Sequence, residues 1–242
     1  RLSHSNSMLS KMMKHHKGGG GGYLDMTSPQ HGGGLPGVES SKREEKGDQK
    51  EEEKKKKKKK SCLMVYTDGA CEGNGKKRAL AGYGVYFDGD DDDYDGSRPE
   101  PISRPLEGSL QTNQRAEMMA VISAVDVLLK ITEKKHLRHH HHHHHHHHHN
   151  ERSSAPSLLP VVILSDSQYT VKGITSWVPN WKRNKWLTAT KQPVKNRDLW
   201  TRLDANLNRL RALRPIEVKW VRGHSGNFGN EMADRLAVII RF

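Results

Sequence analysis

The chain has 242 residues, of which 33% are hydrophobic, and this allows one folded domain with a sizeable core and hardly two. Lysine and arginine (41) exceed aspartate and glutamate (28), and the formal net charge of +13 favours an anionic partner such as nucleic acid or an acidic membrane face. No run approaches the roughly 18 apolar residues that span a bilayer, and no apolar signal segment opens the sequence. We therefore expect neither membrane insertion nor secretion.

Residues 1–60 have the composition of a disordered tail. They contain glycine runs, a mixed charge block and seven consecutive lysines, Lys54–Lys60, and nothing that could bury a core. This segment holds 15 basic and 8 acidic side chains, so +7 of the net charge of +13 lies there. We predict a low-complexity basic tail at 1–61 and one folded domain at 62–242. The two cysteines, Cys62 and Cys71, fit neither a disulfide framework nor a zinc site, so we expect reduced thiols.

The apolar pattern from Cys62 onward predicts a mixed sheet with flanking helices. In chain order, we expect strands at 62–66, 80–87 and about 102–107. An amphipathic helix follows from 113 to about 134, with Thr112 and Asn113 as candidate caps. The remaining elements are a buried strand at 160–164, helices at 168–175 and 198–213, a half-buried strand at 216–221 and a closing helix at 230–240. The order fits the α/β class.

Two low-complexity inserts, at about 88–98 and 136–156, interrupt this pattern. The first holds six aspartates between Asp88 and Asp95 and starts like a calcium loop, but Ile102 stands where a bidentate glutamate is needed. We interpret it as a solvated hairpin loop. The second contains eleven consecutive histidines, His139–His149, which can bind nickel or zinc adventitiously. A physiological role in metal storage is the less favoured interpretation.

Four acidic residues stand where an ordinary surface charge is not expected. Asp68 follows directly on the first buried strand and Asp166 directly on the fourth, so both emerge at one sheet edge if these strands are neighbours. Glu117 and Asp234 each lie about one turn inside a predicted helix, where the helix dipole favours an anion. Any one of them alone fits a cap, a turn or a surface ion pair.

Together, the four carboxylates indicate a metal site. Carboxylates gathered at a sheet edge repel one another and must either raise their pKa values or bind cations. Hard divalent ions such as Mg²⁺ or Mn²⁺ prefer such oxygen ligands. Two of these ions roughly 3.5 to 4 Å apart form the clamp used for in-line phosphodiester hydrolysis.

Five segments around these residues resemble type 1 ribonuclease H in order and spacing: Tyr66–Cys71, Thr112–Glu117, Leu164–Tyr169, Gly223–Gly226 and Asn230–Ala237. The resemblance covers 62–242 apart from the two inserts. It implies the ribonuclease H-like fold, a five-stranded mixed sheet flanked by helices, and cleavage of the RNA strand of RNA/DNA hybrids. It also implies metal-binding, catalytic roles for Asp68, Glu117, Asp166 and Asp234. His224 matches the family histidine that helps proton transfer and product release.

The resemblance extends to residues that would bind the hybrid. Side chains matching family contacts to RNA are Asn74, Asn113, Gln114 and Gln168. The segment from Trp177 to Trp186 interleaves tryptophans with cations and resembles a basic protrusion that grips DNA, which places Trp177, Trp181 and Lys182 on that strand. Without the resemblance, a run of tryptophans like this one is more often buried in a hydrophobic core than exposed for binding. Thr112 and Asn196 match a phosphate pocket on the DNA strand, although Leu110 stands where animal enzymes carry a basic residue.

The implied mechanism uses two Mg²⁺ ions, with Mn²⁺ as a substitute, and leaves 5′-phosphate and 3′-hydroxyl ends. The implied partner is an RNA/DNA hybrid duplex bound by a monomer, with no membrane. Three alternatives remain open: the ribonuclease H domain of a retroelement polyprotein, a catalytically silent hybrid-binding protein, and a histidine-rich metal buffer. Lys54–Lys60 favours a nuclear location, while the basic, serine-containing residues 1–24 are compatible with a mitochondrial one.

Overall fold

The structure is a computed structural model that describes residues 62–94, 96, 98–143 and 158–238. The predicted tail at 1–61 and the greater part of the histidine run lie outside the described residues. Within the described part of the chain, no helix is long and apolar enough to cross a bilayer.

A five-stranded mixed sheet forms the centre of the domain, as the sequence predicts. Its strands are β1 (Leu63–Glu72), β2 (Leu80–Asp88), β3 (Ile102–Pro105), β4 (Val161–Ser165) and β5 (Ile216–Trp220). They lie in the order β3-β2-β1-β4-β5. The first three strands form an antiparallel meander, and β1, β4 and β5 run parallel. Central β1 and β4 are the continuous apolar runs of the sequence, because strands covered on both faces have no solvent side.

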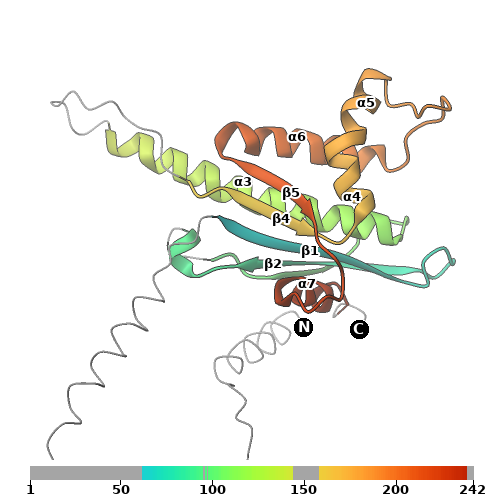
Figure 1. The fold of residues 1–242 in the computed structure, drawn as a ribbon, viewed down its shortest axis with the longest axis horizontal. Coiled ribbons are helices and arrows are strands. Elements are labelled where there is room, and N and C mark those ends of the chain that lie inside the picture. Colours follow the sequence, from blue (N-terminus) through green and yellow to red (C-terminus); the bar gives the residue numbers. More distant parts are fainter. Residues whose placement is uncertain (1–61, 95, 97, 144–157, 239–242) are drawn as a thin grey trace, which may run out of the picture. The chain divides into compact units, whose positions relative to one another are not determined.

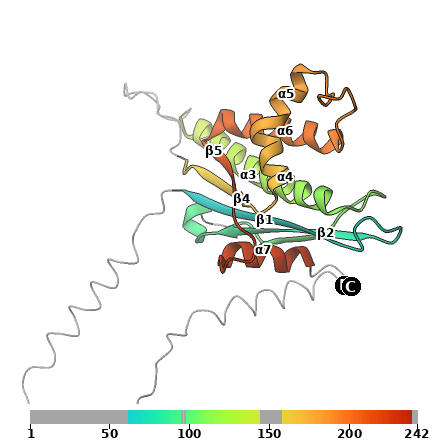
Figure 2. The same ribbon diagram turned by 45° about the vertical axis from the view of Figure 1, so that its right-hand side comes forward.

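Helices cover both faces of this sheet (Figures 1 and 2). One face carries α3 (Asn113–His143), α4 (Gln168–Lys172), α5 (Val178–Arg183) and α6 (Arg197–Leu213), while α7 (Phe228–Val238) lies on the other. The apolar residues of α6 recur once per helical turn. Leu199, Leu203 and Leu207 are buried in this way in the hydrophobic core. Each such side chain contributes about 1.5–3 kcal/mol by leaving water.

Several elements differ in length from their predictions. β1 continues to Glu72, so Asp68 lies inside the strand rather than directly after it. α7 begins at Phe228, which places Asp234 in the second turn and beyond the reach of the N-terminal dipole. The single helix predicted at 168–175 is instead α4 followed by a π-helical segment, η2 (Gly173–Trp177), and then α5.

The aspartate-rich insert is only partly the solvated loop that its composition indicates. Asp91–Tyr94 form a 3-10 turn, η1, and Tyr94 is only 4% exposed. The Tyr94 ring packs edge-on against Phe87, with ring centroids 6.3 Å apart, and its hydroxyl donates to the carbonyl of Asp88 at 3.0 Å. One aromatic side chain therefore anchors the insert in the core while Asp91 and Asp92 remain in solvent.

Two glycines let helices touch the sheet backbone from opposite faces. A Cβ placed on Gly69 of β1 would lie 2.2 Å from the backbone nitrogen of Glu117 in α3. A Cβ on Gly84 of β2 would lie 2.3 Å from the carbonyl oxygen of Ala233 in α7. The residues flanking these contacts, Asp68, Glu117 and Asp234, are thereby brought to one region of the domain.

We predict that Gly69→Ala lowers the free energy of unfolding by about 3 kcal/mol or more, because the added methyl group forces α3 away from β1. Urea denaturation measures the loss. Gly75→Ala is the matched control, because no atom lies within 4 Å of its added Cβ. Only the positive φ of Gly75, 81°, opposes that change, at a cost of about 1–2 kcal/mol. Equal losses in the two variants would contradict the packing explanation.

Candidate active site

The register of β1 and β4 brings two of the predicted carboxylates to the same sheet edge. Thr67 and Ser165 are paired across these parallel strands, and Asp68 and Asp166 are the next residues of each. Asp68 is only 9% exposed, whereas Asp166 is half-buried. The indole nitrogen of Trp220, at the end of β5, donates to the backbone carbonyl of Asp166 at 3.0 Å and holds the segment beyond β4 in place.

Glu117 reaches this edge from the second turn of α3, and both of its carboxylate oxygens accept hydrogen bonds. Asn113 Nδ2 donates to Oε1 at 2.7 Å, and Ser167 Oγ donates to Oε2 at 2.5 Å. Ser167 is also the N-cap of α4, because its hydroxyl oxygen accepts from the backbone N–H of Thr170. The side chain of Glu117 is therefore oriented by α3 and by the start of α4 together.

The fourth carboxylate, Asp234, comes from the opposite face of the sheet. Asp68 pairs with Gly84 on β2, and Gly84 contacts Ala233 of α7, the residue before Asp234. The structure thus gathers all four predicted acidic residues, from β1, α3, the end of β4 and α7. They are separated in sequence and meet only through the sheet register and two helix contacts.

The electrostatic consequence is largest for Asp68. Burial raises its pKa to about 8, and the negative charge of Asp166, followed by smaller contributions from Asp234 and Glu117, acts in the same direction. The backbone N–H of Gly69, which donates to Asp68 Oδ1 at 2.7 Å, opposes this shift. Burial also raises the pKa of Glu117, with a further contribution from Asp166, while the hydrogen bond from Ser167 lowers it.

The side chains fit a hard divalent cation by their chemistry. All four donors are carboxylates, and their mutual repulsion at neutral pH is relieved by positive charge. A buried amide adds to this, because Asn230 donates Nδ2 to Asp166 Oδ2 at 3.5 Å while its buried Oδ1 has no hydrogen-bond partner. Across the described residues, however, no group of three or more His, Cys, Asp or Glu side chains is already arranged to hold a metal ion. The hydrogen bonds of Glu117 direct its carboxylate toward Asn113 and Ser167.

His224 lies in an exposed loop after β5, as predicted. Its backbone has a φ of 50°, and Ser225 Oγ donates to the carbonyl of Arg222 at 2.7 Å across the turn. The preceding residue, Gly223, lies against the carboxylates at the sheet edge, since a Cβ there would stand 2.7 Å from Asp166 Oδ2. The loop is thus positioned by direct contact with a carboxylate, and His224 is one residue away.

A cavity of about 530 Å³ opens beside the carboxylates and gathers most of the predicted substrate contacts. Its lining residues are Asn74, Thr112, Asn113, Gln114, Glu117, Asp166, Ser167, Gln168 and Tyr169. The backbone N–H of Asn113 donates to Asn74 Oδ1 at 3.3 Å, which ties the β1–β2 turn to the start of α3. Thr112 caps that helix, because its hydroxyl accepts from the N–H of Arg115 at 3.3 Å, so the side chain of Asn113 is not the cap.

The predicted aromatic contacts lie beside this cavity rather than in it. Trp177 and Trp181 are half-buried in a row of rings with Tyr169 and Trp200, whose neighbouring centroids are 5.4 to 5.8 Å apart. Much of this tryptophan stripe is therefore core, the interpretation that its composition alone favours. Lys182 is exposed and bound to Asp204 at 2.7 Å. A role of these residues in binding stays a prediction.

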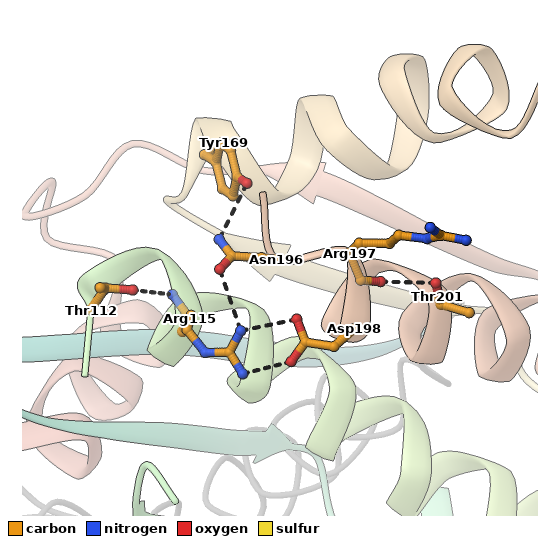
Figure 3. Close-up of polar contacts among 7 residues, drawn as sticks. All are labelled: Thr112, Arg115, Tyr169, Asn196, Arg197, Asp198 and Thr201. Carbon is orange, nitrogen blue, oxygen red and sulfur yellow. Dashed lines mark hydrogen bonds and ion pairs between the residues drawn. The ribbon is translucent and has the colours of Figure 1, made fainter. Parts of the chain in front are cut away.

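Asn196 is linked to Arg115, near the start of α3, by a polar network that Figure 3 shows. Arg115 donates to both carboxylate oxygens of Asp198, at 2.7 and 3.0 Å, and to Asn196 Oδ1 at 3.4 Å. Asn196 Nδ2 in turn donates to the hydroxyl of Tyr169 at 3.4 Å. Asn196 adopts a left-handed conformation with φ of 55° at the start of α6, so this network fixes an unusual backbone as well as the amide.

Sequence reasoning missed four residues that organise the site: Arg115, Ser167, Tyr169 and Asn230. Ser167 carried a signal, since a serine before a helical pattern is a cap candidate. Arg115, Tyr169 and Asn230 lie in the segments that resemble the family, but their contacts could not be inferred there, because their partners Asp198, Asn196 and Asp166 are 83, 27 and 64 residues away. Near Thr112, Leu110 is 63% exposed and supplies no charge, in line with its departure from the family pattern.

Comparisons with known proteins agree with this α/β fold. The RNase H family profile matches residues 59–240. Ribonuclease HI of Pseudomonas aeruginosa is 37% identical over 177 residues, which cover 72% of this chain and 90% of that protein. Ribonuclease H of Schizosaccharomyces pombe is 38% identical and covers 72% of this chain and 51% of that protein. The structure of a foamy viral protease-reverse transcriptase in complex with an RNA/DNA hybrid is similar in fold, with a TM-score of 0.50, 22% identity and coverage of 74% of this chain and 20% of that one.

The strand order, the flanking helices and the four carboxylates at one sheet edge define a ribonuclease H-like domain. The chain belongs to the RNase H family.

We predict that Asp68→Asn stabilises the metal-free protein at alkaline pH. The folded state keeps the Asp68 proton up to about pH 8, whereas the unfolded chain loses it near pH 3.8. The protonated Asp68 therefore contributes fully to the stability of the fold below about pH 4. This contribution is lost as the pH rises through about 8. At about pH 9 the variant should be more stable than wild type by about 1 kcal/mol or more, and the difference should vanish near pH 4. Urea unfolding in the presence of a chelator measures the free energy of unfolding of both proteins. If the difference between them did not change with pH, the raised pKa of buried Asp68 would be contradicted.

Proposed function

We propose that this protein is an endonuclease that hydrolyses the RNA strand of RNA/DNA hybrids. The observation that carries the proposal is the meeting of four carboxylates at the edge of a polar cavity, with the pKa of Asp68 raised to about 8. Hydrolysis of RNA in such hybrids is the general activity of the RNase H family, and the relatives from P. aeruginosa and S. pombe carry the name. A group of carboxyl side chains beside an open polar cavity suits a metal-dependent phosphodiesterase.

Two Mg²⁺ ions, replaceable by Mn²⁺, complete the site in this proposal, held by Asp68, Glu117, Asp166 and Asp234. Such ions lower the pKa of an attacking water and neutralise charge on the scissile phosphate and on the departing 3′-oxygen. The products carry 5′-phosphate and 3′-hydroxyl ends. The contribution of the protein is to hold the carboxylates against their repulsion, through the rigid register of β1 with β4 and the hydrogen bonds to Glu117.

The polar lining of the cavity explains how a hybrid would be distinguished from other duplexes. Asn74, Asn113, Gln114 and Gln168 present amides that can donate to and accept from 2′-hydroxyls, which only the RNA strand carries. Thr112 and Asn196 are both linked to Arg115, Thr112 through the backbone N–H and Asn196 through the guanidinium, and this supports a shared contact with a phosphate of the other strand. We infer that Trp177 of η2 and Trp181 and Lys182 of α5 support that contact. The duplex is bound by one protomer.

The test is cleavage of an end-labelled RNA strand offered as hybrid, as RNA duplex and as single strand, with and without Mg²⁺. We expect metal-dependent cutting of the hybrid alone and its loss in Asp166→Asn, a nearly isosteric change that removes one negative charge. Thermal unfolding shows whether the variant is folded. Tight binding of the hybrid by wild type without any cutting would overturn the catalytic assignment and leave a binding protein built on this fold.

His224→Ala should slow cleavage without abolishing it. An imidazole can deliver a proton to the leaving group, a contribution of roughly 100-fold, while the carboxylates still supply the metal site. Single-turnover rates measured across pH should show a flattened profile in the variant. Ser225→Ala, in the same exposed loop, is the control and should retain the wild-type profile. A variant as inactive as Asp166→Asn would place His224 in the metal site instead.

We also propose a nuclear location, directed by the seven lysines Lys54–Lys60, over a mitochondrial one directed by residues 1–24. A fluorescent fusion of the chain should accumulate in the nucleus, and the same fusion with these lysines changed to serine should not. Retention in the nucleus, or import into mitochondria by both forms, would overturn this assignment.

A further inference from the structure

The turn between β1 and β2 carries three consecutive cations at its tip. Lys76, Lys77 and Arg78 are all exposed. The hairpin that bears them projects beyond the sheet near the start of α3, on the same side of the domain as α5 and the segment leading to α6 (Figures 1 and 2). Throughout the described residues, no hydrogen bond or ion pair involves these three side chains.

This lack of partners distinguishes the hairpin from the helices, where many cations are neutralised. Ion pairs of 2.7 Å join Arg115 to Asp198, Lys182 to Asp204, Arg202 to Asp126 and Arg209 to Glu133. Three adjacent cations without a counter-charge repel one another and create a local positive potential. An external anion relieves this repulsion.

The hairpin is ordered and is attached to the candidate active site. The backbone N–H of Lys76 donates to the carbonyl of Gly73 at 2.8 Å, and the N–H of Ala79 donates to the carbonyl of Lys76 at 3.2 Å. Asn74, in the same turn, accepts from the N–H of Asn113 and lines the cavity. The turn that carries the three cations therefore adjoins the cavity through Asn74, and it is held relative to α3 before any ligand arrives.

The position of the hairpin relative to Asp68 indicates which strand it faces. β1 carries Asp68 and continues for four residues to Glu72 before the turn, a distance of about 13 Å at about 3.3 Å per residue. Along the axis of a duplex, where each strand presents one phosphate per about 3.4 Å, this length spans about four nucleotides. Asn74, in the same turn, lines the cavity with Glu117 and Asp166 and is the residue proposed to contact RNA, so we assign the hairpin to the RNA strand. Lys182 of α5, which is assigned to the DNA strand, is neutralised by Asp204 at 2.7 Å.

We propose that Lys76, Lys77 and Arg78 form a phosphate-binding site for the RNA strand, about four to six nucleotides from the bond that is cut. This inference rests on the proposed function, because it assigns one strand of that substrate. The site positions the strand to be cut and adds sequence-independent affinity, as phosphate contacts do.

The first test compares equilibrium affinities for a short hybrid in an Asp166→Asn background, which prevents cutting. Changing Lys76, Lys77 and Arg78 together to alanine should weaken binding about tenfold at about 0.1 M salt and should lower the slope of log K against log salt by about 2 to 3. The matched control changes three other exposed cations, Lys130, Lys134 and Arg211, and so removes the same net charge. If both triple variants lost the same affinity, the effect of the hairpin cations would be explained by net charge alone, and the proposed phosphate-binding site would be overturned.

The second test assigns the strand with neutral methylphosphonate linkages, placed one at a time in either strand. A neutral linkage about four to six nucleotides from the cut in the RNA strand should weaken binding by the background protein and have little effect on the hairpin variant. The same linkages in the DNA strand should weaken both proteins equally. The opposite pattern would place the hairpin on the DNA strand and contradict the proposal.

Wild-type cleavage of the unmodified hybrid, measured in parallel, separates this inference from the function on which it rests. Normal cleavage together with unchanged affinity of the hairpin variant would overturn the phosphate site alone. Absence of cleavage by wild type would overturn the proposed function, whatever the hairpin variant does.

Discussion

The structure depends on holding negative charges close together at the edge of a sheet. Asp68 is buried inside β1, and Asp166, Glu117 and Asp234 approach it from three other elements. Isolated carboxylates would move apart or take up protons, so the fold must supply the opposing force. It does so through the parallel register of β1 with β4 and through the close contacts of α3 and α7 at Gly69 and Gly84. The hydrophobic core beneath supplies the rigidity that keeps these contacts in place.

Hydrogen bonds to the carboxylates decide how this charge is presented. Ser167 and Asn113 turn Glu117 toward the start of α4, and Asn230 faces Asp166 from α7 with an unsatisfied oxygen. In the described residues, neither arrangement brings three acidic side chains into position to hold an ion. Glu117 is thus firmly oriented, while the cavity beside the carboxylates remains open. This combination suits a site that admits and releases a polyanion.

The sequence predicts the architecture well and the local geometry less well. β1 and β4 are recognisable because continuous apolar runs such as Val161–Leu164 mark strands covered on both faces. The extension of β1 through Gly69 and Ala70 is not recognisable, because small residues carry no strand signal and are there to admit α3. Motif spacing identifies the four carboxylates, but not the distant partners Arg115 and Asn230, which depend on the tertiary fold. The sequence does not decide whether Trp177 and Trp181 are core or binding residues, because their burial depends on neighbours in the fold such as Trp200.

The burial of Tyr94 has a consequence for how this domain can change in length. An aspartate-rich segment of this composition would ordinarily tolerate insertion and deletion at any point, because it contributes only solvated charge. Here one ring is fixed against Phe87 and its hydroxyl is bonded to the carbonyl of Asp88, while Arg98 donates from its backbone N–H to Asp91 and from its guanidinium to the carbonyl of Gly89. Adding or removing a residue between Gly89 and Arg98 would therefore break contacts on both sides of Tyr94. The segment combines a charged surface with a fixed frame, so its side chains can be exchanged more freely than its length can change.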